Sequence, residues 1–236
     1  MNLLAIETST ESCSVALTCN GELIVRSELA PRRHAELLLP MCEEVLAEAS
    51  VSRRQLDAIA VGRGPGAFTG VRLAISAAQG MALALDLPVI PVSSLAALAC
   101  AAPIDAKPIL AVIDARMGEI YSGCFRRDAD GLVEPIGVEH VGSAELLKLP
   151  GGHAWHVIGT GWDSYAEIIR LRLGAAPASA SGRSYPQAAA IARLAEREFN
   201  AGHGLAPEQA LPVYLRDKVA MTRDEQDSAR LSRATP

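Results

Sequence analysis

The sequence predicts an α/β protein of two related lobes, each a mixed sheet with helices packed on it. The first observation is a set of three strand patterns at the N-terminus, over Leu3–Thr8, Ser12–Thr18 and Leu23–Leu29. Asn20-Gly21 separates the last two, and this pair favours a tight hairpin because both residues tolerate a positive φ. We therefore expect the chain to open with three sequential antiparallel strands.

The same order of elements recurs about a hundred residues later, which is the second observation. Pro108–Ile113 is an apolar run that ends at an acid, Asp114. Glu119–Phe125 is the next strand candidate, and Leu132–Val138 returns after an Asp-Gly turn. Repetition on this scale indicates two structurally related lobes. Chance is the alternative explanation, because apolar-acid-hairpin patterns are common.

Helix and strand patterns follow each strand triplet, which is the third observation. His34–Ala49 has apolar residues at the 3.6-residue spacing of an amphipathic helix, with glutamates on its other side. Pro40 lies inside this pattern, so we expect a kink there or a first helical turn just upstream. Further helices are predicted over Thr69–Leu85, Tyr165–Leu173 and Pro186–Phe199, and further strands over Ala58–Val61, Pro88–Val92 and His156–Ile158.

These elements divide the chain into three parts. The first lobe is expected over residues 1–102. A shorter second lobe is expected over residues 103–220, and its last helix is a candidate for packing back on the first lobe. Residues 221–236 are polar and mixed in charge with no periodicity, so we expect a disordered tail there.

Composition and charge exclude several classes of protein. Lys and Arg number 22 against 27 Asp and Glu, and aromatic residues make up 4%, so neither a free-standing nucleic-acid binder nor a base-stacking platform is indicated. The N-terminus lacks the basic region of a signal peptide, and the longest uncharged helical stretch, between Arg72 and Asp86, is too short to span a bilayer. Five scattered cysteines without a CxxC pair indicate neither a disulfide framework nor a zinc site. We expect a cytoplasmic protein without membrane contact.

A glycine-rich segment joins one predicted strand to the helix that follows it. It reads Gly64-Pro65-Gly66-Ala67-Phe68-Thr69-Gly70, with Arg72 just beyond. Such a loop can bind phosphate at a helix N-terminus, but this one lacks the Lys-Ser/Thr pair of a P-loop and the GxGxxG spacing. We favour a structural role, in which Thr69 caps the helix and the glycines allow close approach of the chain.

The helix predicted over Thr69–Leu85 is apolar on both sides. Val71 and Ile75 mark one side, and Leu73 and Ala77 mark the opposite side. A helix that is apolar all round must be covered all round. Burial between the two lobes is one explanation. We favour a subunit interface, because a chain of this size has few layers with which to enclose a helix completely.

Glu7 and Asp114 are candidate catalytic acids, since each ends an apolar run just before a tight loop. In two-lobed phosphotransferases such acids hold a hydrated magnesium ion or orient water. Capping of the adjacent turn explains them equally well. The five histidines are dispersed and no serine has a nucleophile-elbow context, so neither a metal centre nor a Ser-His-Asp arrangement is predicted.

A family resemblance is carried by five segments: LLAIETSTESCSVAL, RRHAELLLP, AVGRGPGAFTGVRLAISAAQGMA, LPVIPVSSLAALA and LPVYLRDKVA. Together they resemble the TsaB family, the bacterial partner subunits in synthesis of threonylcarbamoyladenosine on tRNA. The resemblance runs from Met1 to about Ala220, and residues 128–184 match only loosely. Its most specific part is Gly-Pro-Gly-x-Phe-Thr-Gly-x-Arg. It implies an actin-like, sugar-kinase-type ATPase fold of two lobes.

The resemblance also implies a relationship to TsaD, the catalytic subunit, which carries a metal-binding His-x-x-x-His. In this sequence Ser94 and Leu98 occupy the positions of those two histidines. A hydroxyl and an isobutyl group cannot replace two nitrogen ligands, so no transition-metal site is expected there. The resemblance therefore implies a pseudoenzyme that requires no cofactor of its own, with ATP and a metal ion on partner subunits.

In the family, the two helices of the first lobe pair with the equivalent helices of TsaD. The resemblance thus implies direct binding to TsaD, in a complex that includes the small ATPase TsaE, with tRNA contacted only indirectly. Without TsaD the same surface is expected to form a homodimer. The vestigial phosphate-side loops would contain Glu7, Thr8, Ser9 and Asp114, and the interface residues would be His34, Leu37, Leu38, Met41, Val45, Val71, Ile75, Ala78 and Ala82.

Two other functions stay open from the sequence. One is an ATP-dependent phosphotransferase that uses Glu7 and Asp114 with magnesium. The other is a peptidase acting on TsaD, for which the sequence offers no nucleophile–base pair.

Overall fold

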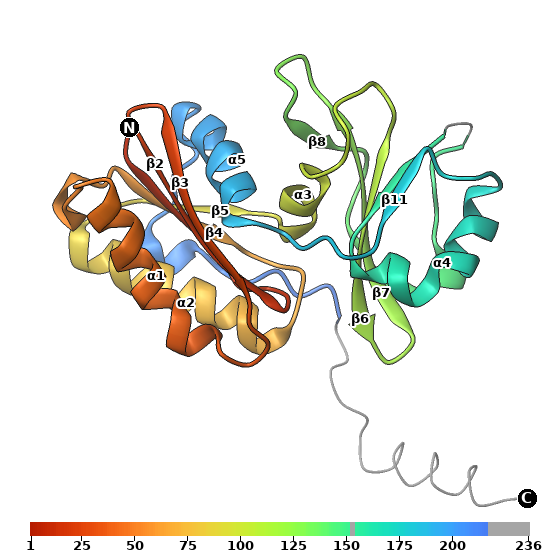
Figure 1. Ribbon diagram of the computed structural model, residues 1–236, viewed down its shortest axis with the longest axis horizontal. Coiled ribbons are helices and arrows are strands. Elements are labelled where there is room, and N and C mark those ends of the chain that lie inside the picture. Colours follow the sequence, from red (N-terminus) through yellow and green to blue (C-terminus); the bar gives the residue numbers. More distant parts are fainter. Residues whose placement is uncertain (152–153, 217–236) are drawn as a thin grey trace, which may run out of the picture.

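The computed structural model describes residues 1–151 and 154–216. Two lobes lie side by side, each built on one sheet, with the short helix α3 (Ser94–Ala99) between them (Figure 1). The first lobe contains β1 (Leu3–Glu7), β2 (Ser12–Cys19), β3 (Glu22–Leu29), α1 (His34–Glu48), β4 (Ala58–Gly62), α2 (Phe68–Leu85) and β5 (Val89–Val92). The second contains β6 (Ile109–Arg116), β7 (Glu119–Arg127), β8 (Val133–Pro135), β9 (His140–Ser143), β10 (His156–Ile158), α4 (Thr160–Leu173) and β11 (Ser179–Ser181), and α5 (Ala188–Asn200) follows.

The two sheets share one topology. Their strand orders are β3-β2-β1-β4-β5 and β8-β7-β6-β10-β11, and β9 also pairs with β7. In the first sheet β1 is antiparallel to β2 and parallel to β4, and in the second β6 is antiparallel to β7 and parallel to β10. This duplication confirms the two related lobes that the recurring acid-and-hairpin layout predicts.

Helices cover both faces of the first sheet. Because successive strand side chains point to opposite faces, β1 is buried on both sides. Leu4 and Ile6 pack with residues of α1 and α2, whereas Leu3 and Ala5 pack with residues of α5. Helix α5 comes from the C-terminal part of the chain and contacts every strand of the first sheet, so this sheet is completed by residues far along the sequence (Figure 1).

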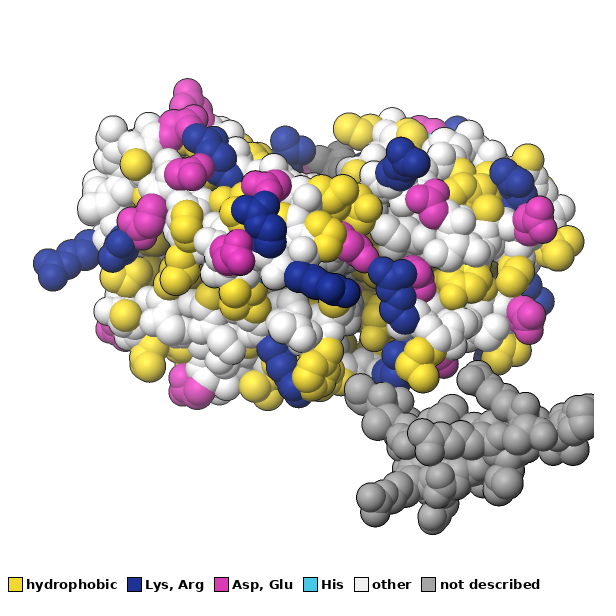
Figure 2. Space-filling view, turned by 60° about the horizontal axis from the view of Figure 1, so that its bottom comes forward, with side chains coloured by type: hydrophobic (Ala, Val, Ile, Leu, Met, Phe, Trp, Pro, Cys, Tyr) yellow, Lys and Arg dark blue, Asp and Glu magenta, His cyan; other side chains and the backbone are white. Residues whose placement is uncertain are grey.

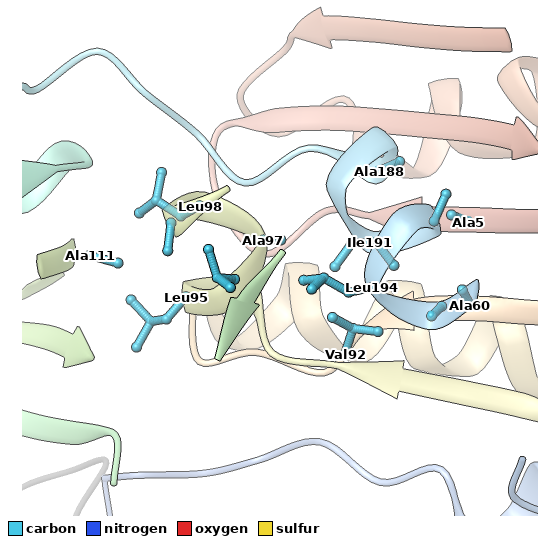
Figure 3. Packing of buried hydrophobic residues seen from close by; sticks show 14 of the residues in the cluster. Ala5, Ala60, Val92, Leu95, Ala97, Leu98, Ala111, Ala188, Ile191 and Leu194 are labelled. Atoms are coloured by element: carbon cyan, nitrogen blue, oxygen red, sulfur yellow. The ribbon is translucent and has the colours of Figure 1, made fainter. Parts of the chain in front are cut away.

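Helix α3 is the apolar connection between the lobes. Figure 3 shows Leu95 and Leu98 pointing toward Ala111 of the second sheet, while Ala97 lies toward Leu194 of α5. All five side chains are buried. The hydroxyl of Ser93 caps this helix by accepting a hydrogen bond from the Ala96 amide at 3.1 Å. The lobes therefore share one hydrophobic cluster.

Several elements differ from the sequence prediction. Helix α3 and strands β9 and β11 lie outside the predicted elements, because they are too short to show a clear period. Helix α4 begins at Thr160 and not at the predicted Tyr165. Tyr165 lies inside the helix at a kink, where its backbone angles are not helical. Helix α1 includes Pro40, which follows its first turn. The predicted tail, residues 221–236, and residues 217–220 of the predicted second lobe lie outside the described residues.

By length and composition alone, α2 is apolar enough to cross a membrane. In the structure it is a core helix of the first lobe, because one side of it packs on the sheet. The buried residues of that side are Gly70, Val71, Ala74, Ile75, Ala78 and Ala82.

Replacing Leu98 by alanine tests the connection between the lobes. The side chain is fully buried and packs against the second-lobe residue Gly159. We expect Leu98→Ala to lower the free energy of unfolding by about 2–5 kcal/mol, since it leaves a cavity. Leu171→Ala, at a leucine that is 81% exposed, is the control and should change it by less than about 0.5 kcal/mol. Urea denaturation measures both, and equal small effects would contradict the packing described.

Candidate functional site

Glu7, the acid that ends β1, is sealed inside the protein. Its Oε1 accepts a hydrogen bond from the Ser9 amide at 2.5 Å, and its Oε2 accepts one from the Ser94 hydroxyl at 2.7 Å. A Cβ at Gly62 would lie 2.0 Å from this Oε2, so glycine makes room for the carboxylate. Burial raises the pKa of Glu7, partly offset by these hydrogen bonds.

The glycine-rich segment lies directly on the loop that follows Glu7. The Thr8 hydroxyl donates to the carbonyl of Gly70 at 2.7 Å, and the Ala67 amide donates to the carbonyl of Ser9 at 2.7 Å. A Cβ at Gly66 would lie 2.3 Å from the Ser9 carbonyl oxygen, and one at Gly70 would lie 2.0 Å from that of Thr8. The glycines thus permit close backbone packing, and Thr8 and Ser9 are buried by it.

This packing places the predicted phosphate-side residues and corrects one expectation. Glu7 and Thr8 are sealed by the glycine-rich segment, whereas Ser9, which is also buried, borders the cavity between the lobes described below. Thr69 does not cap α2, since the helix begins at Phe68 with Ala67 at the cap position. Within the same segment, Gly64 has a φ of +88°, a backbone conformation that favours glycine.

Asp114 lies near the end of β6 in a turn and an ion pair. Its Oδ1 accepts a hydrogen bond from the Arg116 amide at 2.8 Å, and its Oδ2 lies 3.0 Å from Nη1 of the same residue. The Ser164 hydroxyl also donates to Oδ2, at 3.3 Å. Nη2 of Arg116 reaches Glu11 of the first lobe at 2.8 Å. Asp114 therefore caps its own turn and supports a link between the lobes.

A cavity of about 620 Å³, here called the lower cleft, lies between the lobes beside this ion pair. Asp114 lines it, whereas Glu7 does not. The structure therefore does not bring the two acids together around one open site. Among residues 1–151 and 154–216, no group of three or more His, Cys, Asp or Glu is arranged to hold a metal ion. The lower cleft is lined by Ser9, Glu11, Arg32, His34, Phe68, Asp114, Arg116, Tyr121, Tyr214 and Arg216, among others.

A second cavity of about 580 Å³, the upper cleft, lies between β5, α5 and the second-lobe strands β7 and β8. Its polar side chains include Arg63, Ser93 and Glu139, and the Ser93 hydroxyl donates a hydrogen bond to Glu139. Leu215 lines both clefts, because the C-terminal segment passes between the lobes (Figure 1). No sequence motif groups these residues, so the sequence alone does not point to them.

The predicted interface residues lie mainly in the core of the first lobe, which is a further correction. Helices α1 and α2 turn their most apolar sides to their own sheet, so these side chains cannot line an outer surface. The buried residues are Leu38, Met41, Val45, Val71, Ile75, Ala78 and Ala82. His34 and Leu37 are half-buried, and His34 Nε2 forms a hydrogen bond with the Thr10 carbonyl at 2.9 Å.

The opposite side of α2 is only partly covered, by contacts of Leu73 and Ala77 with the first-lobe core. We call it the outer stripe; it consists of Leu73, Ser76, Ala77, Gly80, Leu83 and Ala84, which are exposed or half-buried. Leu83 is 74% exposed. Figure 2, which brings the lower side of Figure 1 forward, shows hydrophobic side chains scattered among charged ones on the first lobe, with Lys and Arg along the seam between the lobes.

An arginine–aromatic cluster lies at the start of α2. The Arg72 guanidinium lies 3.4 Å from the centre of the Phe68 ring, and its Nε donates to the Tyr214 hydroxyl at 2.6 Å. The contact joins the C-terminal segment to the helix, and all three side chains are exposed in part. The glycine-rich motif predicts Arg72 as part of a structural loop, but no local sequence signal points to Tyr214, its partner 142 positions away.

The duplicated sheet topology, with an acid at the end of the first strand of each lobe, defines an actin-like ATPase fold. The family described as "TsaD: tRNA N6-adenosine threonylcarbamoyltransferase" matches residues 25–223. Two proteins named "tRNA threonylcarbamoyladenosine biosynthesis protein TsaB" are close relatives. The one from Escherichia coli is 39% identical, covering 93% of this chain and 96% of its own length, and the one from Haemophilus influenzae is 40% identical, covering 93% and 95%.

A solved structure, "YeaZ from Pseudomonas aeruginosa", superposes with a TM-score of 0.84 at 45% identity, covering 91% of this chain and 99% of that one. The chain belongs to the TsaB family, which is related to TsaD and works in tRNA threonylcarbamoyladenosine biosynthesis.

Glu7→Gln tests the burial of this carboxyl through the pH dependence of stability. Because the pKa is raised in the folded state, the protonated carboxyl stabilises the fold below the ordinary pKa of 4.5, and this contribution is lost as pH rises through the folded pKa. Glutamine keeps a neutral group able to accept from Ser9 and donate to Ser94. In urea unfolding, we expect the free energy of unfolding of the variant to exceed that of wild type at about pH 8. At about pH 4 the difference between the two should be much smaller. Glu167→Gln, at an exposed site, is the control, and parallel pH profiles would refute the assignment.

Proposed function

We propose that this chain is a non-catalytic scaffold subunit that binds and activates TsaD in transfer of threonylcarbamoyl to the adenosine adjacent to the tRNA anticodon. Membership of the TsaB family supports the pathway. The observation that carries the scaffold role is the outer stripe of α2, where Gly80 and Leu83 are exposed and Leu73 and Ala77 are only partly covered by the first-lobe core. A partner helix that packed there would complete the burial of α2.

The residue sizes along the outer stripe favour a helix as its partner. Gly80 stands in the interior of α2, where glycine costs about 0.5–1 kcal/mol relative to alanine. Nothing lies within 4 Å of the position a Cβ would take there, so packing inside this chain does not require glycine. With Ser76, Ala77 and Ala84 it forms a shallow, small-residue surface that lets another backbone approach closely.

Charge around these helices supports an apolar contact. The glutamates on the outer side of α1 already pair within the chain: Arg26 contacts Glu44 at 3.1 Å, and Arg53 contacts Glu43 at 2.7 Å. Exposed ion pairs of this kind contribute little to stability, but they leave few unbalanced charges beside the stripe. Leu39 on α1 is a further exposed leucine of the first lobe, at 55%.

The absence of catalysis by this chain is part of the proposal. Glu7 is fully buried, and its two carboxylate oxygens accept hydrogen bonds from Ser9 and Ser94. It therefore cannot reach a magnesium ion in the lower cleft without rearrangement. We therefore expect no cofactor on this chain, with ATP and a metal ion on partner subunits and TsaE in the complex. Contact with tRNA would be indirect, and without TsaD the outer stripe would pair with itself in a homodimer.

The alternative phosphotransferase makes a different prediction for ATP. Calorimetric titration that found tight magnesium-dependent ATP binding, lost in Glu7→Ala, would favour that alternative over the scaffold. No observation favours a peptidase, and TsaD that stays intact on long incubation with this chain would dispose of it.

Leu83→Glu tests the docking surface. Because Leu83 is 74% exposed, the substitution should leave the fold intact while it places a charge in the proposed contact. We expect association with TsaD, followed by sedimentation velocity, to weaken at least tenfold. Leu171→Glu, at a leucine that is 81% exposed near the end of α4 in the second lobe, is the matched control. If both variants associate like wild type, the outer stripe is not the interface.

Gly80→Ala separates stability from docking. Alanine should stabilise the isolated chain by about 0.5–1 kcal/mol, since its Cβ meets open space. The same methyl group would hold a partner helix away, so we expect weaker association with TsaD by calorimetry. Increased stability together with unchanged association would show that no helix packs closely at this position.

A further inference from the structure

Residues 210–216, here called the strap, cross from the first lobe to the second (Figure 1). The first residue of the strap is fixed in the first lobe. Ala210 is fully buried, and its carbonyl accepts a hydrogen bond from the Gln79 side chain of α2 at 3.1 Å. The Val213 amide then donates to the carbonyl of Arg63 at 2.9 Å. The first half of the strap is therefore attached to α2 and to the residue that follows β4.

Two further anchors hold the other half of the strap. The Tyr214 hydroxyl accepts a hydrogen bond from Nε of Arg72 at 2.6 Å, again on α2. Arg216 reaches the second lobe, where its Nε donates to the Glu119 carboxylate at 3.0 Å and its Nη2 donates to the Ala115 carbonyl at 3.1 Å. The strap thus ties a first-lobe helix to the β6–β7 hairpin of the second lobe.

Polar contacts, and not burial, hold the strap beyond Ala210. None of the described residues 211–216 is buried, and Leu211 and Tyr214 are 63% and 48% exposed. Segments with few buried apolar contacts and accessible hydrogen bonds open at a lower free-energy cost than the whole protein. Water can replace each broken hydrogen bond at such a surface. The strap can therefore detach while both lobes stay folded.

The strap is also the partition between the two clefts. Its residues that line the lower cleft are Val213, Tyr214, Leu215 and Arg216. Leu215 lines the upper cleft as well. Because one side chain borders both cavities, its departure would join them into a single gap between the lobes. Among the described strap residues, Arg216 is the one that hydrogen-bonds to the second lobe, so its ion pair acts as the lock.

We propose that residues 210–216 form a releasable strap that opens and closes the partition between the clefts. Attached, as in this structure, the strap ties α2 to the second lobe and keeps the two clefts apart. Released from its Arg216 end as far as Ala210, it joins them. The ion pair between Arg216 and Glu119 sets the fraction of time that the strap is attached. This device goes beyond the scaffold role and does not depend on it.

The test is amide hydrogen exchange of the full chain, followed residue by residue by NMR and corrected for intrinsic rates. The Val213 amide reports attachment, because its acceptor lies in the first lobe. The Arg63 amide is the internal reference, since it donates to the carbonyl of Val92 in β5 at 2.8 Å whether or not the strap is attached. In wild type we expect Val213 to exchange at least about tenfold faster than Arg63. Arg216→Gln should accelerate Val213 at least about fivefold more and leave Arg63 unchanged.

Two more variants assign the effect to the lock. Glu119→Gln removes the acceptor of the same ion pair and should also accelerate Val213, and the double variant should exchange no faster than Arg216→Gln because the two residues act as one pair. Arg126→Gln, which breaks another ion pair of the second lobe, is the matched control and should leave Val213 unchanged. The proposal is overturned if Val213 and Arg63 exchange at the same rate in wild type, if Arg216→Gln leaves Val213 unchanged, or if it accelerates both amides equally.

Discussion

Close backbone packing between the glycine-rich segment and the loop after β1 is the constraint on which the first lobe depends. The carbonyls of Thr8 and Ser9 lie where side chains at Gly70 and Gly66 would otherwise stand. This contact fixes the start of α2 and closes the space beside Glu7, whose carboxylate turns inward to Ser9 and Ser94. A loop that could bind phosphate in an open arrangement has here become a packing element.

The packing also decides how the apolar surface of α2 is divided. With its N-terminus held on the β1 loop, the helix lays Val71, Ile75 and Ala78 on the sheet and turns Gly80 and Leu83 outward. One helix thus contributes to two different surfaces, one inside the lobe and one outside it. The first packs within the chain, and the second is the surface on which the proposed scaffold role rests.

The repeat of strands and turns could be predicted from sequence because hairpin signals and alternation are local, as in Ser12–Thr18 and Asn20-Gly21. The apolar nature of α2 is equally clear from the sequence, but composition alone does not say which side faces the sheet, so the predicted interface includes Ile75 and Ala78, which pack in the core. Helix α3 is too short for periodicity. The partners of Glu7, Arg72 and Glu139 come from distant segments, and spacing in one sequence does not reveal such contacts.

The position of α5 has a consequence for biosynthesis. The face of the first sheet that carries Leu3, Ala5 and Ala60 is covered by a helix that begins at Ala188. During translation these strands can be synthesised and can pair well before α5 emerges from the ribosome. The apolar face of the first sheet therefore stays exposed to solvent until α5 is made. Long-range contacts of this kind slow folding and expose incompletely folded chains to aggregation, so the risk of aggregation is greatest before α5 docks on the sheet.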